Sequence, residues 1–535
     1  MGVGNETPSA PDVMSGLLDR IADRRPLHEA LTDGRVRLDW STYRDRAAAL
    51  AGALRERGVR PGDRVAVHLP KSVDSFVAAH AVVRLGAVMV PVDWFAPPAY
   101  VGEVIGDAEP VAIVSAAGEE RLREITGASP GPVVVDPHTE GSPASPADID
   151  PASPAYIVYT SGSTGRPKGI VHTHSSALAY ARKAVATYGI NSADRLVNIA
   201  PLHFDQSTFE LWAAPLAGAA VVVVPDGVLR FPASVSDLVA GEKATVWYSV
   251  PFAITQLVTR GAVDDRDLTS LRWVLFGGES FPPASLAAAQ RALPHARFSN
   301  VYGPAEVNQC TFHHLDQLSY GDDQPIDPDT GPADSVVPIG RPWADTEALL
   351  VDAADQVIDG AGDGELLVSS DTMMEGYWRR PELTAASIGT RSDTGTRRWY
   401  RTGDLVRRRD DGTLVFLGRT DHQTKLRGYR IELEAIESVV AESPEVAACA
   451  VLVERGRDDR LVALVAPTLD EEARASLLGL LRRRLPSYAV PAEILGVESL
   501  PRSGVGKVDR TAAAALLAEI RGEAGHTVAA PKPVG

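Results

Sequence analysis

The segment from residue 159 to residue 169 carries residue types that bind phosphate groups. It reads Tyr-Thr-Ser-Gly-Ser-Thr-Gly-Arg-Pro-Lys-Gly and follows an apolar run that is typical of a strand end. Glycines free the backbone to curl around a ligand, hydroxyls donate hydrogen bonds, and the lysine adds a positive charge. The residues concerned are Thr160, Ser161, Gly162, Ser163, Thr164, Gly165 and Lys168. We therefore expect a polyphosphate-binding loop here.

This loop is not a Walker A motif. Only two residues separate Gly162 from Gly165, and a glycine follows the lysine, whereas the Walker motif has four residues between its glycines. Taken without the rest of the chain, the segment could equally be a Gly/Ser linker with an incidental lysine. Motifs further along the chain decide between these two interpretations.

Apolar runs that could position the loop alternate with helical patterns over most of the chain. Strands are predicted over residues 64–69, 87–92, 111–115, 219–224, 245–249 and 273–276, and helices over 73–85 and 286–293. Several of these strands are apolar throughout, as strands buried on both faces are. The pattern predicts an α/β fold whose large, multi-sheet N-terminal domain spans residues 1–420.

A smaller α+β domain is predicted over residues 421–520. Helical patterns cover residues 432–442 and 471–485, and strand patterns cover 447–453 and 461–465. Residues 521–535 are small, polar and proline-containing, which predicts a disordered tail.

Composition excludes several classes of protein. The formal net charge is −17, which argues against a nucleic-acid-binding surface. Cys310 and Cys449 are the only cysteines among 535 residues, so we expect a reducing cytoplasmic location and no disulfide framework. The N-terminus lacks a signal-peptide pattern, and the apolar stretch over 213–224 is interrupted by Pro215 and too short to span a membrane. We therefore expect no membrane association.

Further polar segments follow the loop in a fixed order. They are Phe-Asp-Gln-Ser at 204–207, Asn-Val-Tyr-Gly-Pro-Ala-Glu at 300–306, Tyr-Arg-Thr-Gly-Asp-Leu at 400–405, Gly-Arg-Thr-Asp at 418–421, Lys-Leu-Arg-Gly-Tyr-Arg-Ile-Glu at 425–432 and Gly-Val-Gly-Lys-Val-Asp-Arg at 504–510. In this order and spacing they resemble the adenylate-forming (ANL) superfamily, and most closely the amino-acid adenylation domains of nonribosomal peptide synthetases. The resemblance covers roughly residues 25 to 515.

The resemblance implies a reaction in two halves. A carboxylate attacks the α-phosphate of ATP to give an acyl-adenylate and pyrophosphate, and a thiol then takes the acyl group. Because both reactants of the first half are anions, cations must neutralise them. Lys507 is the expected bridge between carboxylate and phosphate, with Lys168 on the phosphate loop, and Glu306 is expected to hold Mg²⁺. The alternatives are a solvated lysine at 507 and a helix-start charge at 306.

The resemblance also assigns the remaining nucleotide contacts. Asp404 would accept hydrogen bonds from the ribose hydroxyls, although Thr-Gly-Asp is also a common exposed turn. Tyr302 would stack on adenine, although ordinary core packing is the alternative. Nucleotide binding is expected at Thr160, Ser161, Gly162, Ser163, Thr164, Gly165, Asn300, Tyr302, Gly303, Asp404 and Arg419. The small domain is expected to be mobile about a hinge at Asp421, which turns Lys425 and the Arg-Gly-Tyr-Arg loop toward the site for thioester formation.

Two residues depart from the pattern of the superfamily. Ala305 replaces a threonine that usually follows Gly-Pro, and Val505 replaces a common asparagine. Neither change removes a charge, so we expect activity to survive.

Asp205 indicates which acid is activated. In the amino-acid-activating branch an aspartate here pairs with the ammonium group of the substrate, and a cationic partner would offset the cost of burying the carboxylate. A structural aspartate bonded to backbone amides is the alternative. The resemblance places the side-chain pocket at Asp205, Gln206, Phe209, Tyr248, Leu275, Gly277, Val301, Gln309 and Cys310. Bulky Phe209 and Tyr248 favour a small substrate, alanine first and then glycine or serine, while Gln309 leaves polar or β-amino acids open.

The thiol acceptor is expected to belong to a separate acyl or peptidyl carrier protein. Too few residues follow Lys507 to form a carrier domain. A basic patch at Arg482–Arg484, or second at Arg407–Arg409, could dock an acidic carrier, although a solvated helix face explains it as well. An acyl-CoA ligase and a catalytically silent binding protein of the same fold remain the alternatives.

Overall fold

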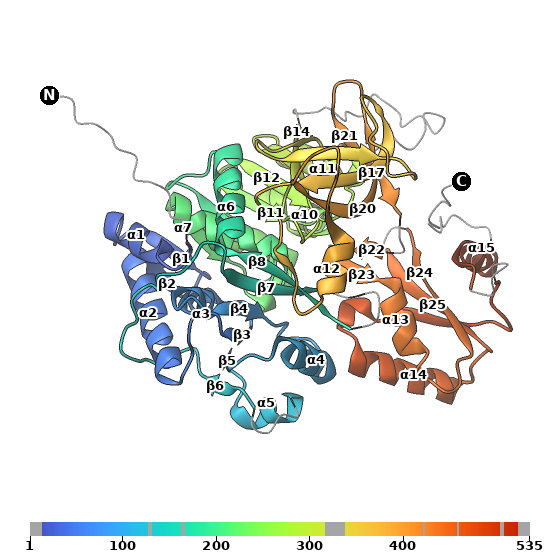
Figure 1. The fold of residues 1–535 in the computed structure, drawn as a ribbon, viewed down its shortest axis with the longest axis horizontal. Helices are drawn as coiled ribbons and strands as arrows, with labels where there is room; N and C mark the ends of the chain where they lie inside the picture. The colour runs from blue at the N-terminus through green and yellow to red at the C-terminus, as the bar shows by residue number, and fades with distance from the viewer. Residues whose placement is uncertain are drawn as a thin grey trace.

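The computed structural model describes residues 13–126, 131–160, 162, 166–315, 337–420, 423–456, 459–502 and 508–522. One sheet contains the strands on either side of the phosphate loop, in the order β18-β8-β7-β4-β3-β5-β6 (Figure 1). Its strands are β3 (Arg64–His68), β4 (Val88–Pro91), β5 (Ala112–Ser115), β6 (Val133–Val135), β7 (Pro154–Thr160), β8 (Lys168–Thr173) and β18 (Gly376–Tyr377). β7 and β8 are antiparallel, with Thr160 paired to Lys168. The phosphate loop therefore connects two adjacent strands.

A second sheet carries strands that are expected to contribute to the side-chain pocket. Its strand order is β15-β14-β13-β12-β11-β9-β10-β1-β2. Its strands are β1 (Glu29–Thr32), β2 (Arg37–Asp39), β9 (Arg195–Asn198), β10 (Ala220–Val223), β11 (Val246–Ser249), β12 (Trp273–Gly277), β13 (Arg297–Tyr302), β14 (Thr311–Leu315) and β15 (Arg341–Pro342). β11, β12 and β13 run parallel, and β11 and β12 are buried at every residue. Parallel strands end at the same edge of a sheet, which is where α/β proteins place ligands.

Helices cover these sheets (Figure 1). They are α1 (Leu17–Arg24), α2 (Trp40–Glu56), α3 (Val73–Arg84), α4 (Pro98–Ala108), α5 (Glu119–Thr126), α6 (His174–Tyr188), α7 (Ala214–Ala217), α8 (Asp226–Leu229), α9 (Pro232–Gly241), α10 (Pro251–Arg260) and α11 (Pro283–Ala292), with short turns η1 (Asp205–Ser207), η2 (Phe209–Ala213) and η3 (Val263–Asp265). Helix α2 begins where the carboxylate of Asp39 accepts a hydrogen bond from the Thr42 N–H at 2.7 Å.

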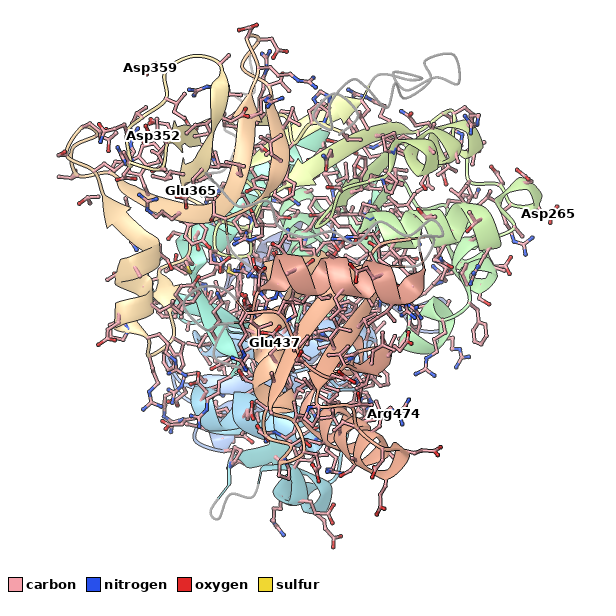
Figure 2. The ribbon with its side chains drawn as sticks, turned by 90° about the vertical axis from the view of Figure 1, so that its right-hand side faces the viewer. Asp265, Asp352, Asp359, Glu365, Glu437 and Arg474 are labelled. Carbon is pink, nitrogen blue, oxygen red and sulfur yellow. The ribbon has the colours of Figure 1, made fainter. Side chains whose placement is uncertain are left out.

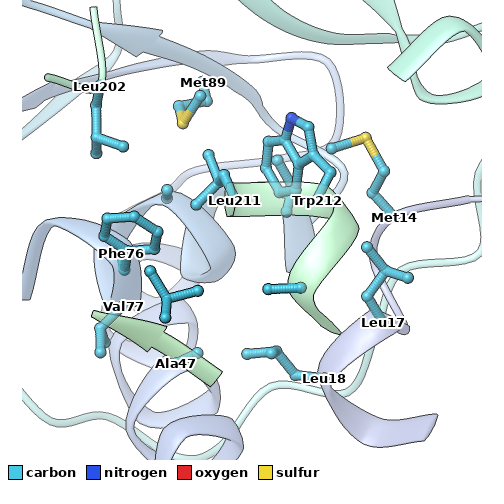
Figure 3. Close-up of a cluster of buried hydrophobic side chains, with 14 of the residues drawn as sticks. Met14, Leu17, Leu18, Ala47, Phe76, Val77, Met89, Leu202, Leu211 and Trp212 are labelled. Carbon is cyan, nitrogen blue, oxygen red and sulfur yellow. The ribbon is translucent and has the colours of Figure 1, made fainter. Parts of the chain in front are cut away.

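A large apolar core fixes the segment that follows Asp205. Leu211 and Trp212 of η2 are buried together with Met14 and Leu17 near the N-terminal helix (Figure 3). η2 is a π-helical turn, a feature often found at functional sites. The core therefore anchors the backbone that presents Asp205.

A third, antiparallel sheet carries Asp404 and Arg419. It consists of β16 (Glu347–Val351), β17 (Gly362–Ser369), β19 (Ile388–Thr390), β20 (Arg398–Arg408) and β21 (Leu414–Arg419), beside α12 (Pro381–Ser387). Asp404 and Arg419 are paired across β20 and β21.

The C-terminal part, orange to red in Figure 1, is a smaller α+β unit. It contains the hairpin of β22 (Gln423–Leu426) and β23 (Tyr429–Glu432), the sheet of β24 (Ala448–Glu454), β25 (Arg460–Ala466) and β26 (Glu493–Gly496), and α13 (Leu433–Val440), α14 (Glu471–Arg484), η4 (Ser487–Ala489) and α15 (Arg510–Arg521). Helix α15 crosses in front of this sheet, where Arg510 binds the carboxylate of Glu437 at 2.6 Å (Figure 2). Helix α14 packs against α4 of the larger part.

The predicted mixed α/β class, with a larger N-terminal and a smaller C-terminal part, is confirmed. The expected strands and helices are present with ends shifted by a few residues. For example, the helix predicted from residue 432 begins at Leu433 because Glu432 ends β23. Across the described ranges no helix is both long and apolar enough to cross a membrane.

Candidate active site

A cavity lies at the meeting point of the edge of the second sheet, the phosphate loop and hairpin β22–β23. It brings together predicted residues of both ligand classes. These are Thr160, Asp205, Gln206, Tyr248, Val301, Gly303, Gln309, Asp404 and Arg419. Lys425 and Arg430 of the hairpin also line the cavity.

The nucleotide end is organised around the carboxylate of Asp404. The hydroxyl of Tyr302 donates to Asp404 Oδ2, and Arg419 Nη1 donates to Oδ1. Thr402 Oγ1 accepts from the Asp404 backbone N–H at 3.0 Å. Burial and the neighbouring carboxylate raise the pKa of Tyr302 well above its usual range, so its hydroxyl keeps its proton. Asp404 is thus held in one orientation on two neighbouring strands.

The described part of the phosphate loop presents an unused donor. Thr160 Oγ1 is buried and has no hydrogen-bond partner within the described ranges. Gly162 is required by close packing, because a Cβ there would lie 2.4 Å from the Arg166 carbonyl oxygen. An orphaned hydroxyl at the start of this loop fits a ligand with phosphate oxygens. Ser161, Ser163, Thr164 and Gly165 lie outside the described residues.

Glu306 is a fully buried carboxylate surrounded by donors. Arg430 Nη1 donates to both carboxylate oxygens, at 2.9 and 2.7 Å, and the hydroxyl of Tyr377 donates at 2.8 Å. Lys168 Nζ lies 3.7 Å away. Burial by itself would raise the pKa of the Glu306 carboxyl, but Arg430 and Lys168 lower it well below its usual range. Glu306 therefore stays ionised and binds cations.

Lys168 lies between Glu306 and an aromatic face. Its ammonium stands 4.9 Å from the ring centroid of Tyr377. Burial, reinforced by the charge of Arg430, lowers the pKa of Lys168 below its usual value. An additional anion such as a phosphate would favour the charged form of this lysine.

Asp205 is partly buried at the start of η1 and faces the cavity. Burial raises the pKa of its carboxyl above the usual value, while the ammonium of Lys425 opposes that shift. A cation from the smaller part therefore lies near enough to Asp205 to favour its charged form.

The remaining pocket residues form two layers. Tyr248 and Val301 face the cavity, and each pairs across the sheet with a residue that does not line it, Leu275 and Gly277 respectively. A Cβ at Gly277 would lie 2.2 Å from the Val301 carbonyl oxygen, so strand packing requires glycine there.

Phe209 and Cys310 lie behind the lining. Phe209 is fully buried, with its ring centroid 5.5 Å from that of Tyr248. Cys310 is also fully buried, and its Sγ lies 3.6 Å from the Tyr302 carbonyl oxygen. Both shape the pocket indirectly, by supporting Tyr248 and Tyr302.

Comparison with known proteins identifies the family. Residues 18–378 match the family model described as AMP-binding enzyme, and residues 435–507 match that of the AMP-binding enzyme C-terminal domain. The chain belongs to the AMP-binding enzyme family. The resemblance to adenylate-forming enzymes is thereby confirmed.

Similar members of the AMP-binding enzyme family include two carrier-protein ligases. An L-proline--[L-prolyl-carrier protein] ligase of Pseudomonas fluorescens is 33% identical over 92% of this chain and 96% of its own length. Another, of Streptomyces coelicolor, is 32% identical over 88% of this chain and 91% of its own.

A solved structure of an NRPS protein containing adenylation and PCP domains, bound to a vinylsulfonamide inhibitor, is also similar. It has a TM-score of 0.80 and 28% identity, covering 95% of this chain and 87% of that chain. The amide bond synthetase McbA of Marinactinospora thermotolerans has a TM-score of 0.78 and 26% identity, and the match covers 92% of this chain and 98% of that chain.

Several predicted roles in this AMP-binding enzyme stay predictions. Lys507 and the hinge residue Asp421 lie outside the described residues. Asn300 is not among the lining residues of the cavity, and its Nδ2 donates to the Pro338 carbonyl oxygen at 2.8 Å.

Sequence reasoning missed some supporting residues of this AMP-binding enzyme. His172 Nε2 lies 2.9 Å from the Ala305 carbonyl oxygen and thereby holds the loop before Glu306. Tyr488, which was not named, stacks on Tyr429 of the expected Arg-Gly-Tyr-Arg loop, with ring centroids 3.8 Å apart beside the cavity. These residues come from separate elements, so their spacing in the sequence carries no signal.

Proposed function

We propose that this AMP-binding enzyme activates a small amino acid with ATP and transfers it to the phosphopantetheine thiol of a separate carrier protein. The observation that carries the proposal is that Asp205 and Asp404, the expected ammonium and ribose ligands, line one cavity. The names of the two proline ligases support an amino acid and a carrier protein as reactants. The small number of cysteines supports a cytoplasmic location.

In the first half-reaction, a carboxylate oxygen of the amino acid attacks the α-phosphorus of ATP and pyrophosphate leaves. Asp205 would bind the ammonium group, and the oriented carboxylate of Asp404 would accept hydrogen bonds from the ribose hydroxyls. Lys168 would neutralise phosphate oxygens, and Lys507 would lie between the two anions in the transition state. Holding and neutralising both anions is the main catalytic contribution.

Glu306 fits a role in holding Mg²⁺. It is ionised and attracts two cations, Arg430 and Lys168. In the described ranges no group of three or more acidic, histidine or cysteine side chains could hold a metal by itself. Mg²⁺ typically takes one or two carboxylates together with substrate phosphates, where it neutralises their charge.

In the second half-reaction, the carrier thiol loses its proton and its sulfur attacks the acyl carbon, and AMP leaves. The position of hairpin β22–β23 supports assigning the described arrangement to this step, because Arg430 occupies Glu306 and excludes a metal ion from it. Lys425 would then face the reacting carbonyl group.

The size of the pocket supports a small side chain. Tyr248 fills space beside Asp205, and buried Phe209 prevents it from moving back. By size we propose alanine first, then glycine or serine. Proline belongs in any screen because two similar proteins are named for it.

The carrier would dock near the C-terminal end of α14. Arg484 is already paired with Glu442 and Glu103, so Arg482 and Arg483 are the exposed charges. Arg407 is paired with Asp363, which makes the second patch less suitable.

ATP–pyrophosphate exchange with purified protein tests the proposal. A panel of α-amino acids, β-amino acids, aryl acids and fatty acids should give exchange with a small amino acid. Mass spectrometry of a phosphopantetheine-bearing carrier should then show the aminoacyl adduct, in preference to coenzyme A. Exchange driven only by aryl or fatty acids would refute the assignment.

A further inference from the structure

Gln309 lines the cavity with a carboxamide that lacks a partner. The residue is 4% exposed, and neither Oε1 nor Nε2 has a hydrogen-bond partner of ordinary geometry among the described residues, although the Tyr248 hydroxyl lies close enough to interact with the amide. Buried polar atoms are hydrogen-bonded in the great majority of cases, because leaving them unpaired is unfavourable. An unpaired carboxamide directed at a binding cavity therefore points to a ligand group that pairs with it.

The backbone around Gln309 is held by a hydrogen bond and by close packing. The next residue, Cys310, donates its backbone N–H to the Tyr302 carbonyl oxygen at 2.9 Å. The preceding residue, Asn308, has a left-handed backbone with φ of 55°. A Cβ at Gly303 would lie only 2.7 Å from the Cα of Gln309. The loop thus presents the carboxamide from a rigid position.

Two other neutral polar groups share this wall of the cavity. They are the carboxamide of Gln206 and the hydroxyl of Tyr248. Burial raises the pKa of Tyr248, and both Gln206 and Gln309 lie close enough to its hydroxyl to oppose the shift. Gln206 directly follows Asp205 in the sequence, so this group of polar side chains includes the neighbour of the expected ammonium ligand.

We infer that the substrate is an uncharged amino acid whose side chain carries a hydroxyl or carboxamide that hydrogen-bonds to Gln309. This inference rests on the proposed function and places serine ahead of alanine and glycine. A hydrocarbon side chain would cover the amide without pairing with it. A site built to hydrogen-bond a substrate group rejects analogues that lack the group far more strongly than an apolar pocket rejects a changed shape.

The test compares amino acids of similar shape that differ in one polar group. The purified full chain is assayed for ATP–pyrophosphate exchange with threonine against valine, asparagine against leucine, serine against alanine, and 4-hydroxyproline against proline. In the pair that contains the amino acid with the highest kcat/KM, the value for the polar member should exceed that for the hydrocarbon member by about tenfold or more. An equal or higher value for the hydrocarbon member would overturn the inference.

The variant Gln309→Leu tests whether this residue sets the preference. It removes the amide at nearly constant size, so the ratio within the pair should fall toward unity or invert. Gln356→Leu removes an exposed carboxamide far along the chain and should keep the wild-type ratio. An unchanged ratio in Gln309→Leu would overturn the role of Gln309.

The design separates the inference from the proposed function. Equal or faster exchange with the hydrocarbon amino acids refutes the inference and leaves amino-acid activation standing, whereas no exchange with any amino acid refutes both. If Gln309→Leu fails to fold, Gln309→Met takes its place, and the wild-type ratio is measured without any variant.

Discussion

Arg430 of hairpin β22–β23 binds both carboxylate oxygens of Glu306, at 2.9 and 2.7 Å. The contact places a cation from the smaller part on the carboxylate that we propose as the Mg²⁺ ligand. A guanidinium and a metal ion repel each other and cannot share these oxygens. We therefore propose that the hairpin withdraws before ATP and Mg²⁺ bind and returns once pyrophosphate has left.

Replacing Arg430 by glutamine should separate the two half-reactions. The variant loses a charge-assisted pair that belongs to the transfer arrangement, so transfer to the carrier should fall about tenfold or more while pyrophosphate exchange changes little. Single-turnover loading and exchange are measured on the same preparation. Arg474→Ala, which removes an exposed arginine of α14, serves as control (Figure 2). Equal losses in both steps would contradict the assignment.

Gly428→Ala should also slow transfer to the carrier protein, because the added Cβ creates a steric clash. Arg427 and Gly428 form the turn of the hairpin, both with positive φ, and a Cβ at Gly428 would lie 2.3 Å from Val250 Cγ1 of the larger part. We expect transfer to slow by about tenfold with exchange preserved. Gly412→Ala is a matched control, because its φ of 81° is similar but no atom lies within 4 Å of the added carbon. Identical behaviour of the two variants would show that backbone strain is responsible.

Asp404→Asn should weaken nucleotide binding. The substitution removes the charge that Tyr302 and Arg419 orient, and a lost charge-assisted hydrogen bond corresponds to about tenfold to a hundredfold in affinity. KM for ATP in the exchange assay should rise accordingly. Asp363→Asn, at an exposed pair with Arg407, should leave KM unchanged. A wild-type KM in Asp404→Asn would place the ribose elsewhere.

Acid should destabilise the protein partly through His172. Burial lowers the pKa of this imidazole from 6.5 to about 4. Between these two pH values the unfolded chain binds a proton that the folded chain does not. The contribution of His172 to the free energy of unfolding is therefore complete above pH 6.5 and is lost as the pH falls toward 4. The loss is about 3 kcal/mol at most.

His172→Gln is the variant that measures this contribution. The decrease in Tm between pH 7 and pH 4.5 should be smaller in His172→Gln than in the wild type, by several degrees. His138→Gln changes an exposed histidine and should retain the wild-type decrease. A decrease in His172→Gln that matches the wild type would exclude His172 as the source.

The sequence predicted the parallel sheets because their strands are apolar throughout. β11 and β12 are buried at every residue, and their runs could be recognised without knowledge of partners. The sheet that carries Asp404 was not predicted as a unit. Its longest strand, Arg398–Arg408, alternates buried residues with half-exposed ones and contains several arginines, so it lacks a continuous apolar signal.

Residue types and their order were enough to name candidate residues of the site, but they did not predict the contacts between those residues. Glu306 and Arg430 were both named, yet they lie 124 residues apart and meet only because of how the smaller part packs. Likewise, sequence reasoning treated Phe209 and Gln309 alike as pocket residues. Only the structure distinguishes the buried ring behind the wall from the unpaired amide on it.

The central claim is that Asp205 binds the ammonium group of an amino acid that ATP activates. The most direct measurement is amino-acid-dependent ATP–pyrophosphate exchange by the wild type and by Asp205→Ala, using the preferred amino acid and the same acid without its amino group. If Asp205 binds the ammonium group, the wild type should show exchange with the amino acid only, and Asp205→Ala should lose about a hundredfold or more of it. Equal exchange by Asp205→Ala, or by the wild type with the deaminated acid, would contradict it.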